Sequence, residues 1–204
     1  LAPALALASS GVGSPQIRNR GTIGGNLVTG SPSGDTLTPL FALDASLELA
    51  SAAGRRTVPI GDFYVGPKRT IRRPDELLVS VSFDVPRGGR PGVFIKSCQR
   101  RAQAIAKVSI AFCALKVGDL LADVRVAMGA VAPTVVRVHE AEELLNGSAP
   151  SAEVLGEAAE AIRQAVQPID DVRSTAWWRH HVSGVLLHRA VALWKQGPIT
   201  GPLC

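Results

Sequence analysis

The sequence predicts an α+β protein, because the second half of its 204 residues has strand-like segments followed by separate helix-like segments. Short apolar runs bounded by glycine or proline indicate strands up to about residue 130. The pattern then changes, and segments over about 136–145, 151–166 and 174–194 indicate helices in the remainder. Between these patterns, residues 86–92 (Pro-Arg-Gly-Gly-Arg-Pro-Gly) form a strong break. We therefore expect a first domain over 1–86 and a second over 91–204.

In the first domain, the apolar run over residues 1–8 is expected to be a buried helix. It lacks the basic residues of a secretion signal and contains Pro3. A short helix is expected over 35–43, capped by Asp35 or Thr36. Strands are expected over 45–50, 55–60 and 77–83, with a hairpin turn at Gly54 and a further turn over 61–66.

In the second domain, apolar runs over 93–97, 107–116 and 124–130 precede the three expected helices. Three strands followed by three helices predict a three-stranded antiparallel sheet that carries helices. No internal repeat interrupts this order.

The glycine-rich stretch over 18–35 is the most informative part of the chain. It contains five glycines, yet Ile23, Leu27 and Val28 are apolar. A solvated linker does not need these apolar residues, and a packed strand does not tolerate so much glycine. The combination favours backbone pressed against a ligand, with amide N–H groups available to an anion such as a cofactor phosphate.

Composition excludes several classes of function. The net charge is +5, but the basic residues are scattered and aromatic residues make up only 4%, which argues against nucleic-acid binding. No apolar run approaches the roughly 18 residues of a membrane span. The cysteines Cys98, Cys113 and Cys204 lie far apart, so we expect no metal site in this chain and a reducing, cytoplasmic location.

Four segments, in order along the chain, are similar to the FAD-binding subunit of the molybdenum hydroxylases, the family of xanthine dehydrogenase, carbon monoxide dehydrogenase and aldehyde oxidoreductases. They are Ile-Arg-Asn-Arg-Gly-Thr-Ile-Gly-Gly-Asn over 17–26, with Ser31, Pro32 and Asp35 following, Pro-Asp-Glu-Leu-Leu over 74–78, Arg-Arg-Ala-Gln-Ala-Ile-Ala-Lys-Val over 100–108, and Pro-Ile-Asp-Asp-Val-Arg-Ser-Thr-Ala over 168–176. The resemblance implies the C-terminal half of a molybdopterin-dehydrogenase-type FAD-binding domain followed by the α+β domain. Family members carry a further N-terminal subdomain, and this sequence is expected to begin after it.

The resemblance also implies which residues bind the cofactor. Residues 22–26 match the family's cofactor-contacting loop, which consists here of Thr22, Ile23, Gly24, Gly25 and Asn26. Glycine lets two successive amides approach a phosphate, while Thr22 and Asn26 add polar side chains. An isolated glycine pair would instead indicate a bulge or a tight turn.

Four further positions match family residues around the flavin. Asp35 matches an acid that accepts hydrogen bonds from FAD hydroxyls, although it could also be a plain helix cap. Leu77 and Leu78 match aliphatic residues against the flavin ring, although ordinary strand core would explain them too. Lys96 matches a lysine near the isoalloxazine, and its alternative is a solvated strand lysine.

The implied function is an oxidoreductase subunit that transfers electrons. In the family, a partner subunit carries the molybdenum cofactor and another carries two [2Fe–2S] clusters, from which electrons reach FAD and then NAD⁺, oxygen or a quinone. No residue of this chain is expected to act as a catalytic acid or base, because the flavin performs the chemistry. The alternative is a truncated, flavin-free scaffold subunit of the same complex.

Overall fold

The computed structural model describes residues 2–86, 88–100 and 102–197. The larger sheet has four antiparallel strands in the order β6-β7-β8-β9. Its strands are β6 (Gly92–Ser97), β7 (Val108–Val117), β8 (Leu120–Gly129) and β9 (Val136–Arg137). The expectation of three strands was therefore wrong by one. The short strand β9, which pairs Arg137 with Ala127 and Val136 with Met128, lies where a helix start was expected.

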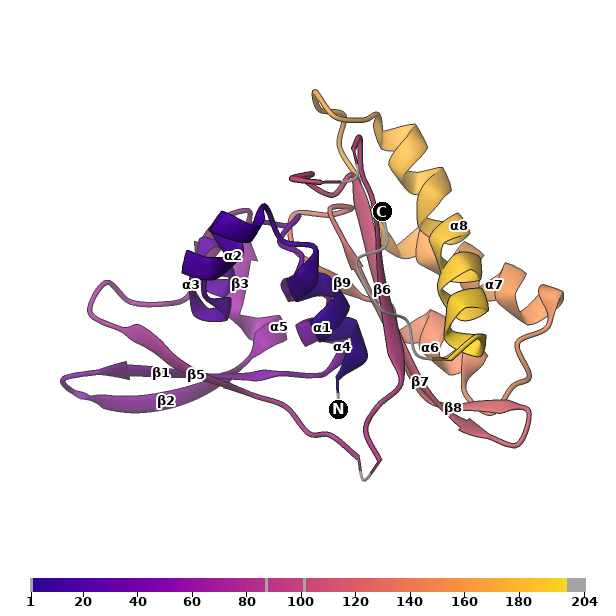
Figure 1. Cartoon of the computed structure of the whole chain (residues 1–204), viewed down its shortest axis with the longest axis horizontal. Coiled ribbons are helices and arrows are strands. Elements are labelled where there is room, and N and C mark those ends of the chain that lie inside the picture. The colour runs from indigo at the N-terminus through magenta and orange to yellow at the C-terminus, as the bar shows by residue number, and fades with distance from the viewer. Residues whose placement is uncertain (1, 87, 101, 198–204) are drawn as a thin grey trace.

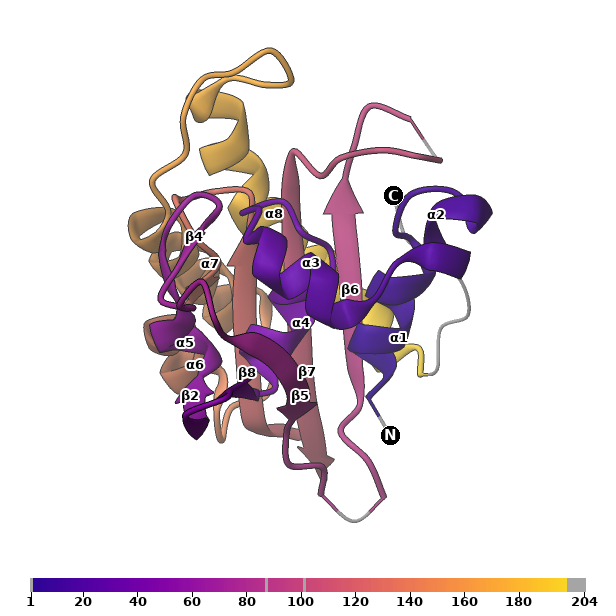
Figure 2. The same ribbon diagram turned by 90° about the vertical axis from the view of Figure 1, so that its left-hand side faces the viewer.

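Helices cover both faces of this sheet (Figure 1). One face carries α6 (His139–Leu145), α7 (Ala152–Ala165) and α8 (Ala176–Lys195), and the other carries α1 (Pro3–Ser10) and α4 (Leu37–Ala42). Figure 2 looks onto the α1 and α4 face. Because side chains alternate along a strand, Ile110 and Phe112 pack with α7 and α8, while Ala111 and Cys113 pack with the N-terminal helices. The sheet is thus the centre of both hydrophobic clusters.

The rest of the N-terminal part forms two smaller sheets and three short helices. A three-stranded sheet in the order β2-β1-β5 extends away from the large sheet (Figure 1), and β3 pairs with β4. The elements are α2 (Pro15–Arg20), α3 (Ile23–Thr29), β1 (Ser46–Ser51), β2 (Gly54–Pro59), α5 (Ile60–Phe63), β3 (Tyr64–Gly66), β4 (Arg69–Thr70) and β5 (Leu77–Ser82). Residues 61–66, expected as a turn, thus form most of α5 and the strand β3.

The glycine-rich stretch is largely helical, which the sequence analysis did not predict. Residues Pro15–Arg20 and Ile23–Thr29 form the helices α2 and α3. Helix α3 is stabilised at both ends despite its glycines: Thr22 caps its start, and Gly30 adopts the left-handed conformation at its end (φ 59°). Leu27 anchors the helix because its side chain is fully buried. Local capping and one buried leucine therefore overcome the low helix propensity of glycine.

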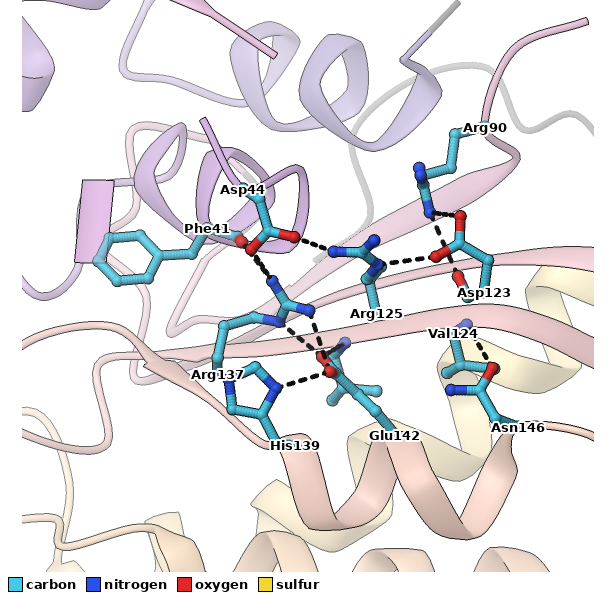
Figure 3. Close-up of polar contacts among 11 residues, drawn as sticks. Phe41, Asp44, Arg90, Asp123, Val124, Arg125, Arg137, His139, Glu142 and Asn146 are labelled. Carbon is cyan, nitrogen blue, oxygen red and sulfur yellow. Dashed lines mark hydrogen bonds and ion pairs between the residues drawn. The ribbon is translucent and has the colours of Figure 1, made fainter. Parts of the chain in front are cut away.

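A chain of alternating charges joins the two parts of the molecule (Figure 3). Asp44, which follows α4, forms ion pairs with Arg125 of β8 and Arg137 of β9. Arg137 also contacts Glu142 of α6, with 2.6 Å between Nε and Oε1, and donates to the Phe41 carbonyl at 3.0 Å. These contacts fix the position of α4, and hence of the residues before it, relative to the large sheet.

Two features are absent from the part of the chain that the structure describes. No helix in the described part of the chain is both long and apolar enough to cross a membrane. The described residues also contain no cluster of three or more histidine, cysteine or acidic side chains able to hold a metal ion.

Candidate FAD-binding site

Two of the residues expected to bind cofactor, Asp35 and Lys96, form a buried ion pair. Lys96 lies near the end of β6 and is 3% exposed, and its Nζ is 2.7 Å from Oδ2 of Asp35. The same ammonium donates to the carbonyls of Gly11 at 3.0 Å and Ala104 at 3.1 Å. Each of its three protons therefore has an acceptor. The alternative of a solvated strand lysine is wrong.

The second oxygen of Asp35 is left without a partner. Oδ1 is buried and accepts no hydrogen bond from the described residues. Burial raises the pKa of this carboxyl above its ordinary value, and the nearby Lys96 ammonium offsets this rise only in part. Nor does Asp35 cap a helix: Thr36 occupies the N-cap position of α4, and no side chain caps that helix. An unpaired buried acceptor of this kind fits a ligand that brings a hydroxyl or amide donor.

The expected cofactor-contacting residues form the first turn of α3. Oγ1 of Thr22 accepts from the Gly25 amide at 2.9 Å, so this threonine serves as a cap. The earlier amides of the turn, those of Ile23 and Gly24, have no partner within the helix. With no Cβ at Gly24 or Gly25, the backbone here remains accessible. This turn can therefore present N–H groups to an anionic ligand.

Asn26 connects this turn to the Asp35 region. Its Oδ1 accepts from the Thr36 hydroxyl at 2.6 Å, which ties α3 to the residue after Asp35. The asparagine was expected to supply a donor to the cofactor. Its oxygen is used within the protein, whereas its NH₂ group has no acceptor among the described residues and remains available as a donor. Asn26 thus holds two expected cofactor-binding segments together.

The expected flavin-lining leucines lie on β5, next to α3. A Cβ at Gly24 would be 4.0 Å from Cδ2 of Leu78, so Gly24 faces this strand. Leu78 is half-buried against the N-terminal core, as ordinary strand core would be. Leu77 is 71% exposed, however, and Ile23 is 41% exposed. Ordinary strand core does not explain Leu77, whose apolar surface remains available to a flat ligand.

An ion pair between Arg56 and Glu76, which the sequence analysis did not predict, holds this part of β5 in place; we call it the Arg56–Glu76 clamp. Glu76, directly before Leu77, accepts two hydrogen bonds from Arg56 of β2, at 2.6 and 2.9 Å. It also accepts from the Arg73 amide at 2.7 Å. These donors lower the pKa of Glu76 to about 2. The pair is separated by 20 residues, so the Arg55-Arg56 and Asp75-Glu76 pairs in the sequence gave no local sign of it.

The structure therefore brings the expected residues into two groups. Asp35 and Lys96 form one, at the junction of α4 and β6. The first turn of α3 with Leu77 and Leu78 of β5 forms the other, and Asn26 links the two through Thr36. An acceptor without a partner, free helix amides and exposed aliphatic side chains match the hydroxyls, phosphates and flat ring of FAD. The residues present thus fit this cofactor.

Comparison with known families agrees with this geometry. Residues 1–87 match the FAD-binding domain of molybdopterin dehydrogenases, and residues 94–193 match the C-terminal domain of CO dehydrogenase flavoproteins. The chain belongs to the family of FAD-binding medium subunits of the molybdenum hydroxylases. The resemblance predicted from the sequence is confirmed.

Individual relatives show how far the similarity extends. The chain is 34% identical to the nicotine 6-hydroxylase medium subunit of Paenarthrobacter nicotinovorans, over 93% of this chain and 66% of that protein. It is 32% identical to the carbon monoxide dehydrogenase medium chain of Hydrogenophaga pseudoflava, over 95% of this chain and 68% of that protein. A solved structure of carbon monoxide dehydrogenase from the same organism superimposes with a TM-score of 0.90 at 31% identity, over 95% of this chain and 67% of that one. The chain thus spans about two thirds of the length of these relatives.

Proposed function

We propose that this chain contributes to an FAD site and acts as the electron-transfer subunit of a molybdenum hydroxylase. The observation that carries the proposal is the buried Oδ1 of Asp35, which has no donor among the described residues although its carboxylate is fixed by Lys96. A buried acceptor without a partner costs free energy, which a cofactor hydroxyl would recover. The family match supplies the identity of the cofactor.

The residues of this chain have separate tasks in this proposal. The Lys96 ammonium holds the Asp35 carboxylate in place, so that Oδ1 can accept from a hydroxyl of FAD. The first amides of α3 would bind a phosphate of the cofactor, as helix N-termini commonly do. Leu77 and Ile23 provide apolar surface, and the Arg56–Glu76 clamp fixes the strand that carries Leu77.

Bound FAD would supply the redox chemistry, because a flavin can accept electrons one at a time and release them in pairs. Its partners in the proposal are an iron–sulfur subunit with two [2Fe–2S] clusters and a subunit with the molybdenum cofactor. The final acceptor is NAD⁺, oxygen or a quinone. The medium-chain and medium-subunit names of the relatives support an assembly of several chains.

The test uses the complex purified through this chain. Its flavin and iron–sulfur absorption are followed after anaerobic reduction and rapid mixing with NAD⁺, oxygen or a soluble quinone. The proposal expects the flavin band to return with one of these acceptors, and an Asp35→Leu variant to lose FAD while it retains the partner subunits. Reoxidation of the clusters at an unchanged rate in a complex without flavin would contradict it.

One observation favours the alternative of a flavin-free scaffold. All three protons of the Lys96 ammonium are already satisfied by protein oxygens, so this lysine also serves the fold. A scaffold would assemble with its partners and contain no flavin. It would also keep the same thermal stability when FAD is added, whereas a specific ligand of the native state stabilises it.

A further inference from the structure

A cavity of about 840 Å³ opens at the other end of β6 from Lys96. It lies among the start of β6, the turn between β7 and β8, the segment before α7 and the end of α8. Its described lining includes Arg90, Val93, Lys116, Leu121, Trp194 and Lys195. None of the residues expected to bind FAD lines it, so this cavity is separate from the candidate FAD site.

One wall of the cavity is apolar and firmly held. Trp194 packs edge-to-face on Phe112, with 5.9 Å between ring centroids, and its Nε1 donates to the Ala114 carbonyl at 3.2 Å. The buried side chains of Val93 and Leu121 lie on the same lining. A rigid indole beside aliphatic side chains provides a surface for an aromatic or aliphatic group.

A buried donor without a partner also lines this cavity. Arg90 is 8% exposed, and its Nε–H has no acceptor among the described residues. The rest of the guanidinium is fixed, because Nη1 contacts the Asp123 carboxylate and donates to the Asp123 carbonyl at 3.3 Å (Figure 3). A buried charged donor without an acceptor is unfavourable, and an oxygen atom of a ligand would satisfy it.

The charges at the mouth favour an anion. Asp123 balances the charge of Arg90, so this pair contributes little net charge. Around it, Lys116 and Lys195 are exposed cations, whereas Asp119 is the one acidic residue among the described lining residues. The mouth is therefore positively charged and would attract a negative group.

We propose that this cavity is a second ligand site, which binds a small organic anion with an aromatic or aliphatic body. The body packs against Trp194, and an oxyanion oxygen accepts from Nε of Arg90 and faces Lys116 and Lys195. A volume of about 840 Å³ suits a ligand of this kind. The site goes beyond the proposed electron transfer and does not depend on FAD.

The test uses anilinonaphthalene sulfonate, a fluorescent aromatic anion, and N-phenylnaphthylamine, a neutral analogue without the sulfonate. Both are titrated into the full chain. Arg90→Lys keeps the positive charge beside Asp123 but removes the buried Nε–H, and should weaken binding of the anion about tenfold. The double variant Lys116→Gln/Lys195→Gln should weaken it roughly threefold to tenfold. Neither change should affect the neutral dye.

Two further variants separate the cavity from the rest of the surface. Ala149→Trp places a large side chain at the exposed mouth and should reduce binding of both dyes. Arg189→Gln removes an exposed charge from α8 outside the lining and should leave binding unchanged. Thermal unfolding of each variant verifies the fold. Unchanged anion binding in Ala149→Trp, or equal losses for both dyes in Arg90→Lys, would overturn the proposal.

Discussion

Asp35 and Lys96 lie 61 residues apart in the chain, yet their Oδ2 and Nζ atoms are 2.7 Å apart inside the protein. The carboxylate comes from the residue before the N-cap of α4, and the ammonium comes from β6, so the pair forms only when the N-terminal part packs on the large sheet. Its remaining oxygen has no donor among the described residues. The same contact that joins the two parts of the fold therefore also presents an acceptor to a ligand.

The first prediction concerns the stability that this pair provides. Lys96→Met leaves a buried carboxylate without its cation and should destabilise the fold by about 3 kcal/mol, as expected when one partner of a buried ion pair is removed. Adding Asp35→Asn should cost less than the sum of the single changes, because the two residues interact directly. Denaturant unfolding measures both. Strictly additive losses would show that the contact contributes nothing.

The second prediction concerns the pH dependence of FAD affinity. Burial raises the pKa of Asp35, whereas donors from bound FAD would favour its charged form and lower that pKa. Affinity should therefore be full above the pKa of the free protein and should fall as the pH drops through it. Fluorescence titration against pH measures this dependence. The same fall in an Asp35→Asn variant would contradict the assigned role.

The third prediction concerns the Arg56–Glu76 clamp, in which Glu76 lies directly before Leu77 of β5. Hydrogen bonds from Arg56 and Arg73 lower the pKa of Glu76 from 4.5 to about 2. Its contribution to stability is therefore present above pH 4.5 and is lost as the pH falls towards 2. Glu76→Gln should be less stable than the wild type at neutral pH, and this gap should close on acidification. Thermal unfolding across this range tests it, and a constant gap would refute the prediction.

The fourth prediction separates the local and functional roles of a glycine. A Cβ at Gly24 would meet nothing closer than 4.0 Å, so Gly24→Ala should raise stability by about 0.5–1 kcal/mol through helix propensity. The same methyl group would obstruct the approach of a phosphate and should weaken FAD binding. Gly156→Ala in α7 is the matched control, because its added Cβ meets nothing within 4 Å and lies outside the site. Equal effects of the two variants on FAD affinity would show that Gly24 does not contribute to the FAD site.

The sequence predicts most strands well, because their side-chain alternation is local. In β1, Leu47 and Leu49 are fully buried, while Ser46, Glu48 and Ala50 beside them are only partly buried. The sequence does not predict β9, which is two residues long and exists only through pairing with β8. It also misses α3, where the Thr22 cap and the buried Leu27 outweigh two glycines. Helix propensity alone therefore gives the wrong result there.

In the candidate site, too, the sequence predicts individual residues but not the contacts between them. The family resemblance singled out Asp35 and Lys96 separately, but only the fold shows that they pair. The Arg56–Glu76 clamp was missed for the same reason, since Arg56 lies on β2, Glu76 directly precedes β5 20 residues later, and no local spacing connects them. Contacts between distant segments determine the electrostatics of this site, and a single sequence does not reveal them.

The most direct measurement of the central claim is the flavin content of the complex purified natively through this chain. Its visible spectrum is recorded, and the flavin released by acid is identified and counted against the chain. We predict FAD in an amount equal to that of this chain, together with iron–sulfur absorption from a partner. Partner subunits and clusters without any flavin would contradict it and would establish the scaffold instead.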